Sequence, residues 1–214
     1  MGTDKLLKLF GFCLILLFIR IIKTEQISYI FLTWNLFLAF IPYLVIKKIK
    51  PEQNKLLQFI LISVTVLFLP NAPYILTDLF HLRERIAAPM WFDLILILSF
   101  AFIGMVFFVL SVNHLLSIFN YLFKSRWITS GLKFLIMLSS GYGIYLGRYL
   151  RLNSWDVVSN PLDLVNKIFS SIFNENCYKE TFSMTITFTI FLYLVFEIVA
   201  SLKSTVNTQT NELS

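Results

Sequence analysis

The sequence predicts an all-α membrane protein, a bundle of about six transmembrane helices with a short amphipathic helix on the outer surface. Hydrophobic residues make up 57% of the 214 residues, and charged residues make up only 14%. A soluble domain usually carries about 25% charged residues. The apolar residues also gather in runs of about 20, the length with which a helix crosses the hydrocarbon core. Lipid is therefore expected to surround most of the chain.

Six segments have the length and composition of a membrane-spanning helix. The first follows Lys5 and Lys8, as a signal peptide would, but it lacks a small-residue cleavage site and ends in charges, so we expect a retained span. Residues 204–214 are polar and are predicted to form a disordered tail after a single transmembrane domain of residues 1–203. The predicted spans are residues 6–22, 28–46, 56–74 with a helical extension to 82, 92–115, 132–150 and 181–202.

The last outer loop predicts a further short helix over residues 160–173. Asn160 can cap it and Pro161 suits its first position. Asp163 and Lys167 form an i,i+4 pair, while leucine, valine, isoleucine and phenylalanine line another face. The helix is expected either to lie on the outer membrane surface or to cover the bundle as a lid.

The net charge of +6 is explained by membrane topology, because the lysines cluster at the ends of apolar runs. Nucleic acid is therefore not an expected partner. With a cytoplasmic N-terminus, ten lysines and arginines lie inside and eight outside, and four of those eight belong to two unusual polar stretches. We therefore predict a multi-pass protein of the plasma membrane with both termini in the cytoplasm.

The two unusual stretches are residues 69–85 and 143–156, and both are predicted at the outer face. The first joins a hydrophobic run to charges and contains two prolines. The second lies at the end of a predicted span and contains Arg148 and Arg151. A rise of about 1.5 Å per residue brings Asn35, in another span, to a similar depth. The candidate substrate-binding residues are Asn35, Asn71, Arg148, Arg151, Asn153 and Asp156, and the candidate catalytic residues are Asp78 and His81.

Each candidate also has a structural interpretation. Asp78 and His81 are spaced i,i+3, so Asp78 could fix the His81 tautomer for acid–base or metal chemistry or make a local hydrogen bond. Arg148 could bind an anionic group or extend to the membrane surface. Asn71 could satisfy carbonyls freed by the neighbouring prolines. Ser139, Gly143 and Gly147 share one helix face, which could bring the arginine end of this span against the third.

Several other residues are predicted to have structural roles. Asp93 is expected to cap a helix beside an interfacial aromatic residue. Glu197 is expected to pair with a cytoplasmic lysine, or alternatively to act as a coupling carboxylate in a transporter. Cys13 lies in the first apolar run and Cys177 in a polar loop, so no disulfide is predicted between them. No cofactor or metal is specified by a motif.

The motifs of this chain resemble those of a bacterial integral-membrane family, catalogued as domain of unknown function 1361. They are Trp-Asn-Leu-Phe-Leu-Ala-Phe-Ile-Pro at residues 34–42, the run at 68–82 from Phe-Leu-Pro-Asn to His-Leu, Trp-Phe-Asp at 91–93, and Gly-Arg-Tyr-Leu-Arg-Leu-Asn-Ser-Trp-Asp at 147–156. The resemblance implies a membrane protein and assigns no activity.

The sequence therefore favours an outward-facing polar pocket in which Arg148 and Arg151 hold an anionic lipid or lipid-linked headgroup, because guanidinium groups match phosphate. One alternative is a membrane-embedded transferase or hydrolase that uses Asp78 and His81. Others are a small transporter or a structural accessory subunit.

Overall fold

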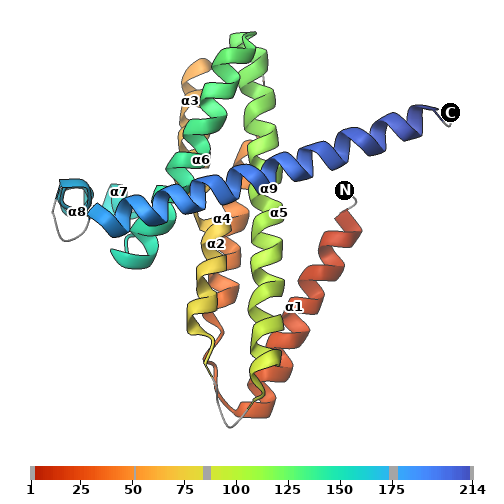
Figure 1. Cartoon of the computed structure of the whole chain (residues 1–214), viewed down its shortest axis with the longest axis vertical. Coiled ribbons are helices and arrows are strands. Elements are labelled where there is room, and N and C mark those ends of the chain that lie inside the picture. The colour runs from red at the N-terminus through yellow and green to blue at the C-terminus, as the bar shows by residue number, and fades with distance from the viewer. Residues whose placement is uncertain (1–2, 51, 84–87, 174–177, 213–214) are drawn as a thin grey trace. The chain divides into compact units, whose positions relative to one another are not determined.

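The computed structural model describes residues 3–50, 52–83, 88–173 and 178–212, which form helices and no β-strand (Figure 1). The chain divides into two compact units, Met1–Leu115 and Leu116–Ser214. The elements are α1 (Thr3–Thr24), α2 (Phe31–Ile46), α3 (Lys55–Phe68), α4 (Asn71–Tyr74), the 3-10 helix η1 (Ile75–His81), α5 (Met90–Phe123), α6 (Arg126–Tyr149), α7 (Asp156–Ser159), α8 (Pro161–Phe173) and α9 (Tyr178–Glu212).

Three of the helices are long and apolar enough to cross a membrane. They cover Lys55–His81, Met90–Phe123 and Lys179–Leu202, while Phe31–Ile46 is a shorter apolar helix. The chain thus has the composition of a membrane protein. The predicted count of six spans remains a proposal, although α1 and α6 have 22 and 24 residues.

The stretch Lys55–His81 is broken where the sequence places its prolines. Asn54 caps α3 by accepting a hydrogen bond from the Leu56 amide at 2.8 Å. Pro70 and Pro73 carry no amide hydrogen, so the α-helical ladder cannot continue through them. The chain passes instead into the short α4 and then into the 3-10 helix η1.

Gly104 allows α5 to approach α4 closely within the first unit. A Cβ atom at this position would overlap the Ala72 carbonyl oxygen. Only glycine fits without moving one of the two backbones. The contact places the segment that contains Pro70 and Pro73 directly against α5, which is long and apolar enough to cross a membrane.

Helices α5 and α9 extend beyond the predicted limits of their spans. The fourth span was predicted to end at Leu115, but α5 continues to Phe123, and α6 begins three residues later. Its 34 residues rise about 51 Å, more than the core thickness of about 30 Å. Helix α9 continues to Glu212, so residues 204–212 are helical where a disordered tail was expected.

The predicted helix over residues 160–173 is present as α8, with Pro161 at its first position. Lys167 and Asp163 form the expected i,i+4 ion pair at 2.8 Å. Ser171 is buried, and its hydroxyl lies 2.8 Å from the Tyr142 hydroxyl while its carbonyl accepts from Thr181 at 2.9 Å. One side of α8 thus packs on α6 and α9. Another side carries exposed apolar residues, which are Leu162, Val165, Phe169 and Phe173.

Candidate functional site

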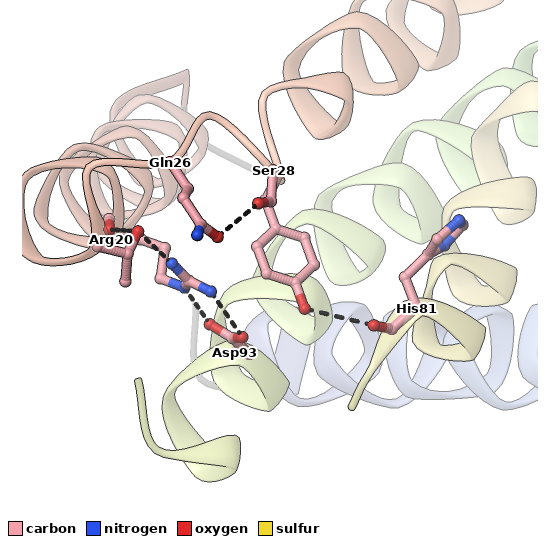
Figure 2. A network of polar contacts seen from close by, with 7 residues as sticks. Arg20, Gln26, Ser28, His81 and Asp93 are labelled. Carbon is pink, nitrogen blue, oxygen red and sulfur yellow. Dashed lines mark hydrogen bonds and ion pairs between the residues drawn. The ribbon is translucent and has the colours of Figure 1, made fainter. Parts of the chain in front are cut away.

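A buried ion pair joins the end of α1 to the start of α5. Arg20 Nε lies 2.6 Å from Asp93 Oδ1, and Arg20 Nη2 donates to Asp93 Oδ2 at 3.2 Å (Figure 2). The two side chains are 1% and 0% exposed. The guanidinium also donates to the Thr24 hydroxyl, which itself donates to the Arg20 carbonyl. We call this group of Arg20, Thr24 and Asp93 the clasp.

Tyr29 connects the clasp to η1. Its ring centroid lies 5.3 Å from the Arg20 guanidinium carbon, within reach of a cation–π interaction. Its hydroxyl donates to the His81 carbonyl oxygen across 3.4 Å, which makes a weak hydrogen bond (Figure 2). The end of η1 therefore lies beside the α1–α5 junction.

Two side-chain contacts hold η1 against α2. Asn35 donates to Asp78 Oδ2 at 2.8 Å, and the rings of Phe31 and His81 lie 5.1 Å apart. Phe31 and Asn35 are one α-helical turn apart, and a 3-10 helix with three residues per turn brings Asp78 and His81 to one face. Asp78 is 1% exposed, whereas His81 is exposed. The structure thus brings the predicted residues Asn35, Asp78 and His81 together.

Asn71 makes a structural hydrogen bond beside the prolines, to a carbonyl other than those of residues 66 and 69, which are the ones that lose an amide partner to Pro70 and Pro73. Its side-chain amide donates to the Phe68 carbonyl at 2.9 Å, at the end of α3 beside the prolines. It supplies a hydrogen bond where the helical ladder is interrupted.

The predicted arginines lie at the end of α6, in the second unit. Arg148 is partly buried in the last turn, and Arg151 is exposed just beyond the helix. Arg151 has a φ of 53°, in the left-handed region that usually favours glycine. The Leu146 carbonyl accepts the amides of both Leu150 and Leu152 at 3.2 Å, which closes the helix end. Among the described residues Arg151 makes no ion pair.

Asp156 organises the turn that follows. Its Oδ2 accepts the Asn153 amide at 2.7 Å, and its Oδ1 accepts the Ser159 hydroxyl at 3.3 Å. These contacts link residue 153 to the first turn of α7. The carboxylate therefore stabilises the backbone that carries the Asn153 side chain, which is exposed.

Helices α6 and α9 pack closely within the second unit. A Cβ atom on Gly141 would lie 2.6 Å from Thr189 Oγ1 and 2.7 Å from the Thr185 carbonyl. Lys133 and Glu197 also join the two helices at 2.5 Å, which confirms the expected lysine partner of Glu197. The sequence pattern had favoured a different face of α6, through Gly143 and Gly147, and the role of Gly141 was missed.

The prediction for Asp93 was wrong. Asp93 is the fourth residue of α5 rather than the residue that caps it, and it is fully buried against Arg20. Arg20 was counted only as a topology signal at the end of a span. A signal was available, because an arginine and an aspartate both occur inside apolar runs whose ends lie at one predicted membrane face.

The predicted pocket residues belong to both units. Asn35, Asn71, Asp78 and His81 lie in the first, and Arg148, Arg151, Asn153 and Asp156 in the second. In the described part of the chain, no group of three or more histidine, cysteine, aspartate or glutamate residues is arranged to hold a metal ion. Cys13 is buried with a free thiol, while Cys177 and Arg85 lie outside the described residues.

A family model described as "Protein of unknown function (DUF1361)" matches residues 34–195. The chain belongs to the DUF1361 family. The match runs from the first turn of α2 to the middle of α9 and therefore contains all the candidate site residues of both units. No curated protein and no solved structure matches the chain. Family membership assigns no reaction to the polar residues.

Proposed function

We propose that this DUF1361 protein binds the phosphate of an anionic lipid or lipid-linked headgroup with the arginine end of α6. The observation that carries the proposal is Arg151. Its cationic side chain is exposed and makes no ion pair among the described residues. Arg148 is three residues earlier, on the last turn of the same helix. Arginine binds phosphate through paired donors, so this helix end suits an anionic headgroup.

The left-handed backbone conformation of Arg151 belongs to the way in which the helix ends. A non-glycine residue in the left-handed region costs about 1–2 kcal/mol. Glu25 and Lys124 have the same conformation after α1 and α5, so this conformation ends a helix and does not by itself indicate binding. At residue 151 it holds an exposed cation just beyond the end of α6.

The proposed binding role also includes a membrane arrangement. We propose six crossings of the plasma membrane, by α1, α2, Lys55–His81, α5, α6 and α9, with both termini in the cytoplasm. The exposed apolar side of α8 then faces lipid at the outer surface. Asn35 and Asp78, hydrogen-bonded at 2.8 Å, are proposed to hold α2 against η1 rather than to perform catalysis.

The test compares two glycine substitutions at matched backbone positions. Arg151→Gly removes the cation and relieves the left-handed conformation, so a loss of binding cannot come from a strained backbone. Lys124→Gly makes the same change after α5 and serves as the control. Each protein is placed in nanodiscs of phosphatidylcholine with a small fraction of phosphatidylglycerol, and the bound lipid is counted by native mass spectrometry.

At the arginine site, Arg151→Gly is expected to bind phosphatidylglycerol about fivefold less, because a basic residue at an anionic surface contributes about 1 kcal/mol. Arg148→Ala combined with Arg151→Gly should lower binding further. Lys124→Gly should retain the parent level. Equal losses in Arg151→Gly and Lys124→Gly, or no loss in either, would reject the headgroup site.

A further inference from the structure

The first unit contains an apolar groove of about 450 Å³ between α1, η1 and α5. Leu9 contributes from α1 and Leu76 from η1, and the α5 wall includes Ile95, Leu98, Phe102 and Met105. We propose that this groove binds one acyl chain of an anionic phospholipid. The site uses neither arginine of α6, so it is independent of the headgroup proposal.

The lining suits hydrocarbon. Among the described lining residues Ser99 is the one with a polar side chain, and its hydroxyl already donates to the Ile95 carbonyl at 2.7 Å. A ligand in the groove therefore meets methyl, methylene and aromatic groups and no unsatisfied donor from Ser99. Such a surface favours an apolar chain, whereas a polar solute would lose its hydration without compensation.

The dimensions of the groove suit one acyl chain. From Ile95 to Met105, α5 rises about 15 Å. This is half of a hydrocarbon core of about 30 Å, and so the depth of one leaflet. The groove holds about 450 Å³, which is within the range of small-ligand sites.

The clasp explains why the groove exists. Helix α1 is fastened to α5 where Arg20 meets Asp93, and Figure 1 shows the two helices separating from there toward the N-terminus. Leu9 lies eleven residues before Arg20 and contributes to the far end of the opening. Two diverging helices leave a wedge that neither helix fills. In a bilayer, the material available to fill a narrow wedge is a lipid chain.

Residues at the clasp end fit the headgroup of the same lipid. Trp91 is 65% exposed and precedes Ile95 by one turn on the same face of α5. Lys23 is exposed in the last turn of α1, three residues after Arg20, and makes no ion pair among the described residues. Tryptophan favours the membrane interface, and a lysine there attracts phosphate. The phospholipid is therefore expected in the leaflet that contains the clasp.

The test blocks the groove and counts the retained lipid. Ser99→Trp fills the opening without removing a hydrogen bond between helices, since the Ser99 hydroxyl bonds only within α5. Ser63→Trp makes the same change on an exposed position of α3 and is the control. Each protein is incubated with phosphatidylglycerol, passed into mild detergent and examined by native mass spectrometry. The parent and Ser63→Trp should retain one phospholipid per chain, and Ser99→Trp should lose most of it.

Retention by Ser99→Trp equal to that of the parent would overturn the proposal, and so would a parent that retains no phospholipid. Should Ser99→Trp fail to fold, the parent and Trp91→Phe can be compared with phosphatidylglycerol brominated on its chains. In the parent, bromine near the groove should quench the fluorescence of Trp91, and Trp91→Phe, which lacks this signal, identifies how much of the quenching belongs to Trp91. Absence of that quenching would also count against the site. Arg151→Gly should keep this lipid, which separates failure here from failure of the headgroup proposal.

A second copy of the chain is the competing occupant, and it makes a different prediction. Leu98→Cys, in a Cys177→Ser background, would then form a disulfide-linked dimer when membranes are oxidised. The acyl-chain proposal predicts a monomer with bound phospholipid. A dimer without that lipid would overturn it.

Discussion

At the scale of single residues, the most informative group is the clasp. A buried charge is costly unless it is paired and hydrogen-bonded. Arg20 meets that condition with two bonds to Asp93 and one to Thr24, and the Tyr29 ring covers its guanidinium. The charged groups of the clasp are thus already bound to partners within the protein. We therefore assign the clasp to the architecture of the first unit and not to ligand binding.

Breaking the clasp on one side is expected to be severe. Arg20→Met or Asp93→Leu leaves one buried charge without its partner, which costs about 3–5 kcal/mol. The double variant Arg20→Met, Asp93→Leu removes both charges and should recover much of that loss. Unfolding in detergent micelles with increasing denaturant measures the free energies.

The double variant decides whether the interaction is specific. If the double variant is less stable than the parent by the sum of the two single losses, the two side chains act independently and the pairing does not matter. Lys23→Met, one turn away and exposed, is the control for loss of a cation near the same helix end and should change stability little.

The sequence predicted residue roles where the cause is local. Asn71 lies beside the prolines that interrupt hydrogen bonding, so a structural hydrogen bond there followed from neighbouring residues, although the carbonyl that accepts it is that of Phe68. The role of Arg20 was missed because its partner lies 73 residues away. Charge counting treats every arginine at a span end as a topology signal. It cannot separate an exposed Lys23 from a buried Arg20 three residues earlier.

At the scale of elements, helix packing in both units depends on glycine. Gly104 admits the Ala72 carbonyl, and Gly141 admits the Thr185 carbonyl and the Thr189 hydroxyl. Association of helices in lipid relies on such close approach. Lipid tails are as apolar as the helix surfaces, so the hydrophobic effect does not drive apolar helices together there. The glycine positions therefore determine which helices become neighbours.

Gly141→Ala should weaken the packing of α6 on α9. The new methyl group would lie 2.6 Å from Thr189 Oγ1, and overpacking of this kind costs about 1–3 kcal/mol. Gly131→Ala is a matched control on the same helix, since nothing lies within 4 Å of the position that its methyl group would take. It should raise stability by up to about 1 kcal/mol through helix propensity. Thermal unfolding in detergent compares the two; equal effects would contradict the proposed packing.

Element limits were harder to predict than element identities. The sequence located each main helix, because apolar runs and proline are local signals. The fourth span was predicted to end at Leu115, where the hydrophobic run fades, although α5 continues to Phe123. Helical hydrogen bonds continue through polar residues as readily as through apolar ones. Hydropathy therefore indicates the part of a helix that suits lipid and not the point at which the helix stops.

At the scale of the whole molecule, the proposed six crossings can be tested by accessibility. In a Cys177→Ser background, cysteine is placed at Gln26, at Ser154 or at Glu52 and treated with a membrane-impermeant reagent in whole cells. Gln26→Cys and Ser154→Cys should react, while Glu52→Cys should react only after the membrane is opened. Reaction of Glu52→Cys alone in whole cells would reverse the proposed orientation, and reaction of Gln26→Cys without Ser154→Cys would reject the six-span count.

The clasp also has a consequence for the order in which the protein is made. Arg20 and Asp93 are 73 residues apart, so at about 5–20 residues per second the arginine is synthesised about 4–15 s before its partner. During that interval the first helix carries a charge that the finished protein buries completely. Helix α1 can therefore reach its final packed position only after α5 has been synthesised. Newly made protein truncated before Asp93 should be extracted from membranes more easily than protein truncated after α5.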